Sequence, residues 1–316
     1  MRKIVVAGEI LVEIMADTVG EGFREAIPLT GPYPSGAPAI FADQAARIGQ
    51  PCAIVSAVGD DDFGRVCLDR LAADGVDVSS VRVDPDRPTG TAFVRYRSDG
   101  SRDFVFNIRH SACGAPELSP SAREALFGAD HLHVMGSSLS SEAFADLALE
   151  AAGAVGARGG TVSFDPNLRK EMLGAPGLRE AMAGILSRAD LFLPSGEELT
   201  MLTRSQDEAG AVAELREMGM TVVHKLGARG ARLFDADGAL FQPGYEAVEV
   251  DPTGAGDCFG GAFTALWLRG TDRAEALALA AAAGALAVER RGPMEGAGDL
   301  DALRRRAAAG PARPSA

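Results

Sequence analysis

Residues 52–75 read CAIVSAVGDDDFGRVCLDRLAADG and contain the unit from which the fold can be built. Cys52–Val58 is a nearly continuous apolar run, as expected of a strand buried on both faces. Phe63–Asp74 has apolar residues at helical spacing and is followed by Gly75, a residue that commonly ends a helix. The stretch therefore predicts a β-strand followed directly by an α-helix.

The same succession of strand and helix recurs along the chain. Lys3–Ala7 is a short β-branched run that ends at Gly8, and Pro38–Ile48 has helical spacing and stops at Gly49. Further strands are predicted at Val162–Asp165, Leu191–Leu193 and Val222–Lys225, and further helices at Ala209–Met218 and Ala274–Glu289. A repeated β-then-α order indicates a mostly parallel sheet with helices on both faces, so the predicted fold class is α/β.

Composition and charge limit the class of protein. The chain has 316 residues, 47% of them hydrophobic, which is enough for one large core with a small appendage. Its formal net charge of −13 argues against a nucleic-acid-binding surface, because such a surface needs clustered Lys and Arg. The four cysteines form no C-x-x-C pair, so they predict neither a zinc site nor a disulfide framework. They are typical of buried thiols in a reducing compartment.

The apolar segments do not resemble targeting or membrane-spanning segments. The basic, apolar start MRKIVVAGEILVEI is interrupted by Glu9 and Glu13, and no convincing small-residue cleavage site follows it. The most apolar later stretch, Ala274–Val288, is shorter than the roughly 20 residues that a membrane span requires. We therefore expect a cytoplasmic protein with no membrane partner.

Two segments interrupt the β-then-α order. Residues 13–33 are extended and punctuated by Pro and Gly, and residues 89–109 contain two alternating runs around SDGS at 98–101, which is a hairpin signal. We expect them to form a small β-sheet that serves as a lid over a cleft, as a dimerisation surface, or as both. The predicted core then comprises residues 1–12, 34–88 and 110–306, the lid comprises 13–33 and 89–109, and 307–316 form a disordered tail.

The stretch most informative about chemistry is Val250–Ala262, VDPTGAGDCFGGA. Gly254, Ala255 and Gly256 stand just before a helical run, so their backbone can approach a ligand and their N–H groups can hold an anion. Asp257 lies in the first turn, where the helix dipole keeps it ionised, and could accept a proton from a hydroxyl during phosphoryl transfer. The alternative is a glycine-rich helix start in which Asp257 only caps the helix.

Two common nucleotide-binding signatures are missing from the sequence. There is no G-x-x-x-x-G-K-[ST] motif, so the chain is not a P-loop protein. No G-x-G-x-x-G motif follows the first predicted strand either. The second absence argues against a dinucleotide-dependent oxidoreductase.

Residues 251–263, DPTGAGDCFGGAF, resemble the C-terminal signature D-P-T-G-A-G-D-x-F-x-G-x-F of the PfkB/ribokinase family of carbohydrate kinases. The similarity extends from Gly8 to about Gly292. It implies a ribokinase-like three-layer α/β/α core with a mostly parallel sheet and a small β-sheet lid. It also implies Asp257 as catalytic base, the amides of 254–256 as the anion hole, and ATP with Mg²⁺ as cofactors. Asp251 and Thr253 match positions near a monovalent-cation site, where K⁺ is the expected ion.

Shorter motifs of the same family assign residues to the sugar. Glu13, in GEILVE, falls where an Asp commonly binds sugar hydroxyls. Gly36 and Ala37, in SGAPAI, fall in a second element of the sugar site. Here Ser35 replaces a Gly, and Ile40 replaces the Asn that usually contacts sugar, so the substrate or its pose is expected to differ from the common one.

The resemblance also assigns residues to the nucleotide. Lys225, Gly227 and Gly230, in KLGARG, correspond to the strand and turn beside the nucleotide, which Gly254 and Gly256 would also contact. Glu198, in SGEE, corresponds to the residue that supports the magnesium–phosphate site indirectly.

Two arginines are candidates for binding negative charge or hydroxyls. Arg169, in DPNLRK, follows a predicted strand end, and the resemblance places it near the transferring phosphate; a surface arginine is the alternative. Arg109 ends the second lid run close to Asn107, and we assign both to the sugar. A strand-terminal salt bridge is the alternative role for Arg109.

The substrate is suggested by longer similarity within the family. The segments GEILVEIMA, PSGAPAIF and RYRSDGSRDFVFNIRHSACG are most similar to bacterial tagatose kinases, which phosphorylate a ketohexose. A 2-keto-3-deoxygluconate kinase is the first alternative, followed by a nucleoside kinase and a non-catalytic sugar sensor. The expected partners are a small sugar, ATP and a second copy of the chain bound through the lid.

Overall fold

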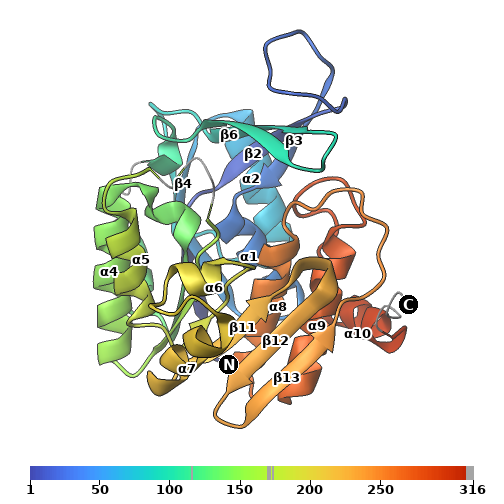
Figure 1. The fold of residues 1–316 in the computed structure, drawn as a ribbon. Helices are drawn as coiled ribbons and strands as arrows, with labels where there is room; N and C mark the ends of the chain where they lie inside the picture. Colours follow the sequence, from blue (N-terminus) through green and yellow to red (C-terminus); the bar gives the residue numbers. More distant parts are fainter. Residues whose placement is uncertain (115–116, 169–171, 173, 311–316) are drawn as a thin grey trace.

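The computed structural model describes residues 1–114, 117–168, 172 and 174–310, and its centre is a large sheet (Figure 1). The sheet has nine strands in the order β13-β12-β11-β10-β9-β8-β1-β4-β5. From β11 to β5 every neighbouring pair is parallel, whereas β12 and β13 add antiparallel strands at one edge. The strands are β1 Ile4–Ala7, β4 Cys52–Gly59, β5 Val81–Asp84, β8 His131–Met135, β9 Thr161–Asp165, β10 Leu191–Phe192, β11 Thr221–Lys225, β12 Gly230–Asp235 and β13 Gly238–Pro243.

Helices cover both faces of this sheet, and each face has its own buried apolar cluster. One face carries α1 Ala37–Arg47, α2 Asp62–Ala73, α8 Ala255–Leu268, α9 Arg273–Ala287 and α10 Leu300–Ala308. The other carries α3 Pro120–Phe127, α4 Glu142–Ala157, α5 Leu178–Leu186, α6 Glu198–Met201 and α7 Glu208–Glu217. Short 3₁₀ turns occur at η1 Ala112–Gly114, η2 Gly136–Ser140 and η4 Gly227–Arg229. This arrangement confirms the predicted three-layer α/β/α core with a mostly parallel sheet.

A smaller sheet projects from the core, at the top of the molecule in Figure 1. Its four strands have the order β3-β2-β6-β7. They are β2 Leu11–Ala16, β3 Leu29–Ser35, β6 Gly90–Tyr96 and β7 Arg102–Asn107. The two inserts meet because β2 pairs with β6 in parallel. On the outer sides of this pair, β3 is antiparallel to β2 and β7 is antiparallel to β6. Since β2 follows β1 almost directly, the small sheet stands at the carboxyl end of the parallel strands, where ligands bind in α/β folds.

The structure corrects the start of the expected tail. Helix α10 continues through Ala308, so residues 307 and 308 are helical, and 311–316 lie outside the described residues. Among the residues described, none of the helices has both the length and the apolar character needed to cross a membrane.

Candidate active site

The N-terminus of α8 is built around Gly254, which adopts the left-handed conformation with φ 82°. A Cβ at this position would lie 2.3 Å from the carbonyl oxygen of Pro293, so glycine is required by both conformation and space. The amide of Ala255 makes only a long contact, 3.5 Å, with the Pro252 carbonyl. The first amides of a helix lack intrahelical acceptors, so this turn can hold an anion.

Asp257 lies in the first turn of α8 and is 4% exposed. Asn167 donates from Nδ2 to Asp257 Oδ1 at 2.8 Å. Asn167 itself has φ 41°, and its backbone N–H donates to Asp165 Oδ1 at 3.2 Å. The turn after β9 therefore fixes the orientation of the Asp257 carboxylate.

A buried ion pair lies beneath the same helix end. Lys225 Nζ pairs with Asp165 Oδ2, and both side chains are almost fully buried. Burial would lower the pKa of Lys225, but the carboxylates of Asp165, Glu198 and Asp257 raise it above its ordinary value. The ammonium therefore stays charged next to the α8 N-terminus, where a Cβ on Gly256 would be 3.6 Å from Nζ. The sequence assigned Lys225 to the nucleotide; the structure directs its side chain toward Asp165.

Glu198 joins two loops at the carboxyl end of the sheet. Its Oε1 accepts from the Leu168 N–H at 2.7 Å, and its Oε2 accepts from the Ser195 N–H at 2.6 Å. Burial raises the pKa of Glu198 and repulsion from Asp165 adds to this, while Lys225 opposes the shift. Because both carboxylate oxygens are engaged by backbone, Glu198 fits a magnesium site through water better than through a direct bond.

A cavity of about 740 Å³ opens between α8 and the small sheet. Six of the sequence-predicted residues line it: Glu13, Gly36, Ala37, Arg109, Thr253 and Asp257. Glu13 is 3% exposed and accepts from Ser35 Oγ at 3.2 Å. The cavity therefore brings residues from β2, α1, the end of the lid hairpin and α8 to one place.

Asn107, which the sequence assigned to the sugar, is not among the described residues that line this cavity. It lies opposite Thr91 in the β6–β7 ladder and donates to Thr91 Oγ1 at 3.2 Å. Phe104 and Phe106 of β7 line the cavity, so Asn107, one residue further on, points to the other face. Asn107 lines a second hollow of about 660 Å³ between the end of β7 and the start of α2, which shares Phe106, Ile108 and Arg109 with the first cavity.

Sequence reasoning missed Glu9, Asn167 and Asp165. Glu9 lines the cavity and accepts from Ser137 Oγ at 2.8 Å and from Ser138 Oγ at 2.5 Å. The available signals were the acidic residue directly after a strand and the Asp-Pro-Asn turn after β9. Neither signal reveals the partner, which lies 128 residues away for Glu9, 90 for Asn167 and 60 for Asp165.

Asp251 and Thr253 lie beside the lid and form hydrogen bonds with it. Asp251 Oδ1 accepts from Tyr96 Oη, and Thr253 Oγ1 accepts from Arg102 Nη1 at 3.2 Å. Asp251 also accepts from the Thr253 N–H at 3.0 Å and the Gly292 N–H at 2.9 Å. These hydrogen bonds connect Asp251 and Thr253 to the lid hairpin and to Gly292.

The turn assigned to the nucleotide lies at the edge of the parallel strands. Gly227 has φ 60° and Gly230 has φ 105°. A Cβ on Gly230 would lie 2.0 Å from the Gln242 carbonyl oxygen, so this glycine is explained by the β12–β13 hairpin. Arg169 lies outside the described residues. Within the described part of the chain, no group of three or more His, Cys, Asp or Glu side chains is placed to hold a metal ion.

These features define a class of protein. A carboxylate and amides at a helix N-terminus, facing a sugar-sized cavity under a β-sheet, are the arrangement needed for phosphoryl transfer to a hydroxyl. Residues 1–299 match the model of the pfkB family of carbohydrate kinases. The chain belongs to this family and is an ATP-dependent carbohydrate kinase.

Individual relatives are similar along almost their whole length. The chain is 34% identical to a 2-dehydro-3-deoxygluconokinase of Thermoproteus tenax, covering 93% of this chain and 91% of the relative. It is 33% identical to a fructokinase of Klebsiella pneumoniae, covering 96% and 98%. A crystal structure described as Ribokinase II from E. coli, in complex with ATP and Mg²⁺, superimposes with a TM-score of 0.91 at 46% identity, covering 98% and 100%.

Proposed function

We propose that this kinase transfers the γ-phosphoryl group of ATP to a hydroxyl of a neutral ketohexose such as tagatose, with Asp257 as general base. The observation that carries the proposal is the position of Asp257: it is in the first turn of α8 and lines the cavity together with Glu13. A hydroxyl in this cavity can give its proton to Asp257 as its oxygen attacks the phosphorus.

In the proposed mechanism each neighbouring residue has one task. Asn167 holds the Asp257 carboxylate, and Glu13, with the Gly36–Ala37 turn, holds the sugar. The amides at 254–256 and the Lys225 ammonium stabilise the negative charge of the transferring group, together with Arg169. When bound with ATP, Mg²⁺ would neutralise phosphate charge, with Glu198 supporting it through water. The small sheet acts as a lid that excludes water.

The charge of the cavity favours a neutral sugar over a sugar acid. Among its described lining residues are the carboxylates of Glu9, Glu13, Glu142 and Asp257, against the single cation Arg109. A carboxylate substrate would be repelled by this lining unless it were held directly by Arg109. That arginine, and the similarity to the Thermoproteus tenax 2-dehydro-3-deoxygluconokinase, keep a keto-acid kinase as the second candidate.

A coupled ADP-release assay with ATP and Mg²⁺ tests the function. The panel is D-tagatose, D-fructose, D-psicose, D-ribose, 2-keto-3-deoxygluconate and adenosine, each measured in KCl and in choline chloride. We expect the highest kcat/KM with a ketohexose. A preference for the keto-acid would contradict the neutral-sugar proposal and assign Arg109 to a carboxylate. A signal with adenosine alone would indicate a nucleoside kinase, and tight sugar binding without ADP release would indicate a sensor.

The two salts test the monovalent-cation site proposed at Asp251 and Thr253. Equal rates of ADP release in KCl and in choline chloride would contradict that site.

We also propose that the lid mediates a homodimer. Both outer strands of the small sheet have an unpaired edge within the described chain, and they expose apolar side chains: Leu29 on β3 is 41% exposed and Val105 on β7 is 44% exposed. Such edges favour pairing with another strand. Light scattering at micromolar concentration should give twice the mass of one chain, and Val105→Lys should reduce it. A monomeric wild-type protein would exclude this assembly.

The proposed location is the cytoplasm, where ATP is available.

A further inference from the structure

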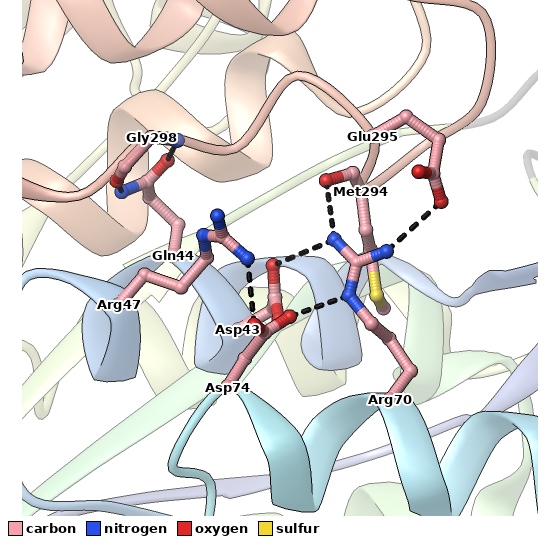
Figure 2. Close-up of polar contacts among 8 residues, drawn as sticks. All are labelled: Asp43, Gln44, Arg47, Arg70, Asp74, Met294, Glu295 and Gly298. Carbon is pink, nitrogen blue, oxygen red and sulfur yellow. Dashed lines mark hydrogen bonds and ion pairs between the residues drawn. The ribbon is translucent and has the colours of Figure 1, made fainter. Parts of the chain in front are cut away.

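A cluster of charged residues lies where α1, α2 and the segment between α9 and α10 meet (Figure 2). We call this segment the α9–α10 connection, residues 288–299. Arg47 Nη1 binds Asp74 Oδ1 at 2.6 Å, and Arg70 Nε also binds Asp74. Asp43 is fully buried, with Oδ2 at 4.0 Å from Arg70 Nη2. None of these side chains lines the cavity of about 740 Å³ between α8 and the small sheet.

The pKa values of two acidic groups in the cluster are shifted in opposite directions. Burial raises the pKa of Asp43 well above its ordinary value, and the neighbouring Asp74 raises it further, against the opposing effect of Arg70 and Arg47. The pKa of Asp74 is lowered: burial opposes the shift, but hydrogen bonds to Asp43 and Arg70 outweigh it. The opposite directions of these two shifts favour the protonated form of Asp43 and the ionised form of Asp74. The two arginines are balanced by Asp74 and, for Arg70, also by Glu295.

Arg70 differs from Arg47 because it reaches the α9–α10 connection. Its Nη2 donates to the Met294 carbonyl oxygen at 2.7 Å, and its Nη1 binds Glu295 Oε1 at 2.9 Å. These bonds come from a guanidinium whose side chain is 21% exposed, so water screens them only in part. Arg47 pairs with Asp74 through Nη1 and, among the described residues, forms no hydrogen bond or ion pair with the connection.

The α9–α10 connection also packs against the N-terminus of α8. The Pro293 carbonyl oxygen occupies the space that a Cβ of Gly254 would need, at 2.3 Å. The Gly292 N–H donates to Asp251 Oδ2 at 2.9 Å. Consecutive residues 292–294 therefore contact Asp251, Gly254 and Arg70. A shift of Met294 would be transmitted through two peptide units to the helix start that carries the proposed anion hole.

We propose that Arg70 is a positioning residue for phosphoryl transfer, holding residues 292–295 so that the Gly254 turn keeps the geometry of the anion hole. This proposal rests on the proposed function of that turn. Loss of the Arg70 contacts should lower kcat with little change in the KM for sugar, since Glu13, Ser35 and Arg109 lie on other elements. A misplacement of about 1 Å far from the reacting atoms can cost up to about 100-fold in rate.

The test compares Arg70→Met with Arg47→Met. Each variant removes one arginine from Asp74 and leaves the other, so the two are matched in charge and in burial of the neighbouring carboxylates. We expect kcat to fall about 10-fold in Arg70→Met and less than about twofold in Arg47→Met, well below both melting temperatures. Arg70→Lys, which can keep a hydrogen bond to the Met294 carbonyl, should recover part of the loss.

Amide hydrogen exchange gives a readout that does not need turnover. Exchange at residues 290–298 and 252–258 should be faster in Arg70→Met and unchanged in Arg47→Met. The proposal is overturned by unchanged exchange in Arg70→Met, by faster exchange with wild-type kcat, or by equal kcat losses in both variants. If the wild-type enzyme turned over none of the sugars, the proposed function would fail, while the exchange data would still decide whether Arg70 holds this turn.

Discussion

Asp257→Asn should bind sugar and ATP with near wild-type affinity and lose at least about 100-fold in kcat. The amide matches the carboxylate in size, and its oxygen can still accept the hydrogen bond that Asn167 Nδ2 makes to Oδ1 at 2.8 Å. It cannot accept the proton of the attacking hydroxyl, so the loss should fall on kcat. The measurements are ADP release at saturating substrates and calorimetric titration of each ligand.

Asp301→Asn is a matched control for this variant. Asp301 also lies in the first turn of a helix, α10, but its side chain is 77% exposed and it is absent from the cavity lining. The control should keep wild-type kcat, which separates the loss of a base from the loss of a helix-dipole interaction. Near wild-type turnover by Asp257→Asn would show that Asp257 is not the base.

Much of the fold follows from local sequence. The strands β1 and β4 are nearly continuous apolar runs, and β9 and β11 are short segments rich in β-branched residues. Glycines follow the helices beside them, so type and order could be predicted from pattern alone. The edge hairpin β12–β13 was not predicted, although RLFDADGALF contains Asp237-Gly238, a dipeptide common in hairpin turns. In the structure Asp235 pairs with Gly238, so residues 236 and 237 form the turn. The Asp-Gly signal was local and could have been recognised. The position of the hairpin at the edge of the sheet could not be predicted from the sequence.

The site was less predictable because its contacts join distant segments. The first turn of α8 was recognisable from its glycines and Asp257, since helix starts are local. The ion pair between Asp165 and Lys225 joins the ends of β9 and β11, and only the strand order brings them together. Asn107 illustrates a second limit of predicting the site from sequence. Alternation along β7 separates its two faces, but which face meets the cavity depends on how the small sheet is mounted on the core.

Gly254→Ala is expected to have the second large effect. The substitution must place a side chain at φ 82°, which costs roughly 1–2 kcal/mol for a residue other than glycine. Its Cβ would also meet the Pro293 carbonyl oxygen at 2.3 Å and the Ile40 Cγ2 atom at 3.3 Å. The turn must therefore move away from the α9–α10 connection. We expect kcat to fall by about 100-fold and the melting temperature to fall.

Gly256→Ala is the control that separates the effect of the backbone conformation of Gly254 from the effect of replacing any glycine in this turn. Gly256 lies inside α8, its conformation is helical, and the nearest atom to an added Cβ is Lys225 Nζ at 3.6 Å, an ordinary contact. Alanine favours the helix there and keeps the backbone N–H, so this variant should lose much less kcat than Gly254→Ala. If instead Gly256→Ala were the more damaged enzyme, the phosphoryl group would pass over Gly256 too closely for a methyl group. The anion hole would then depend on clearance at Gly256 and not on the conformation of Gly254.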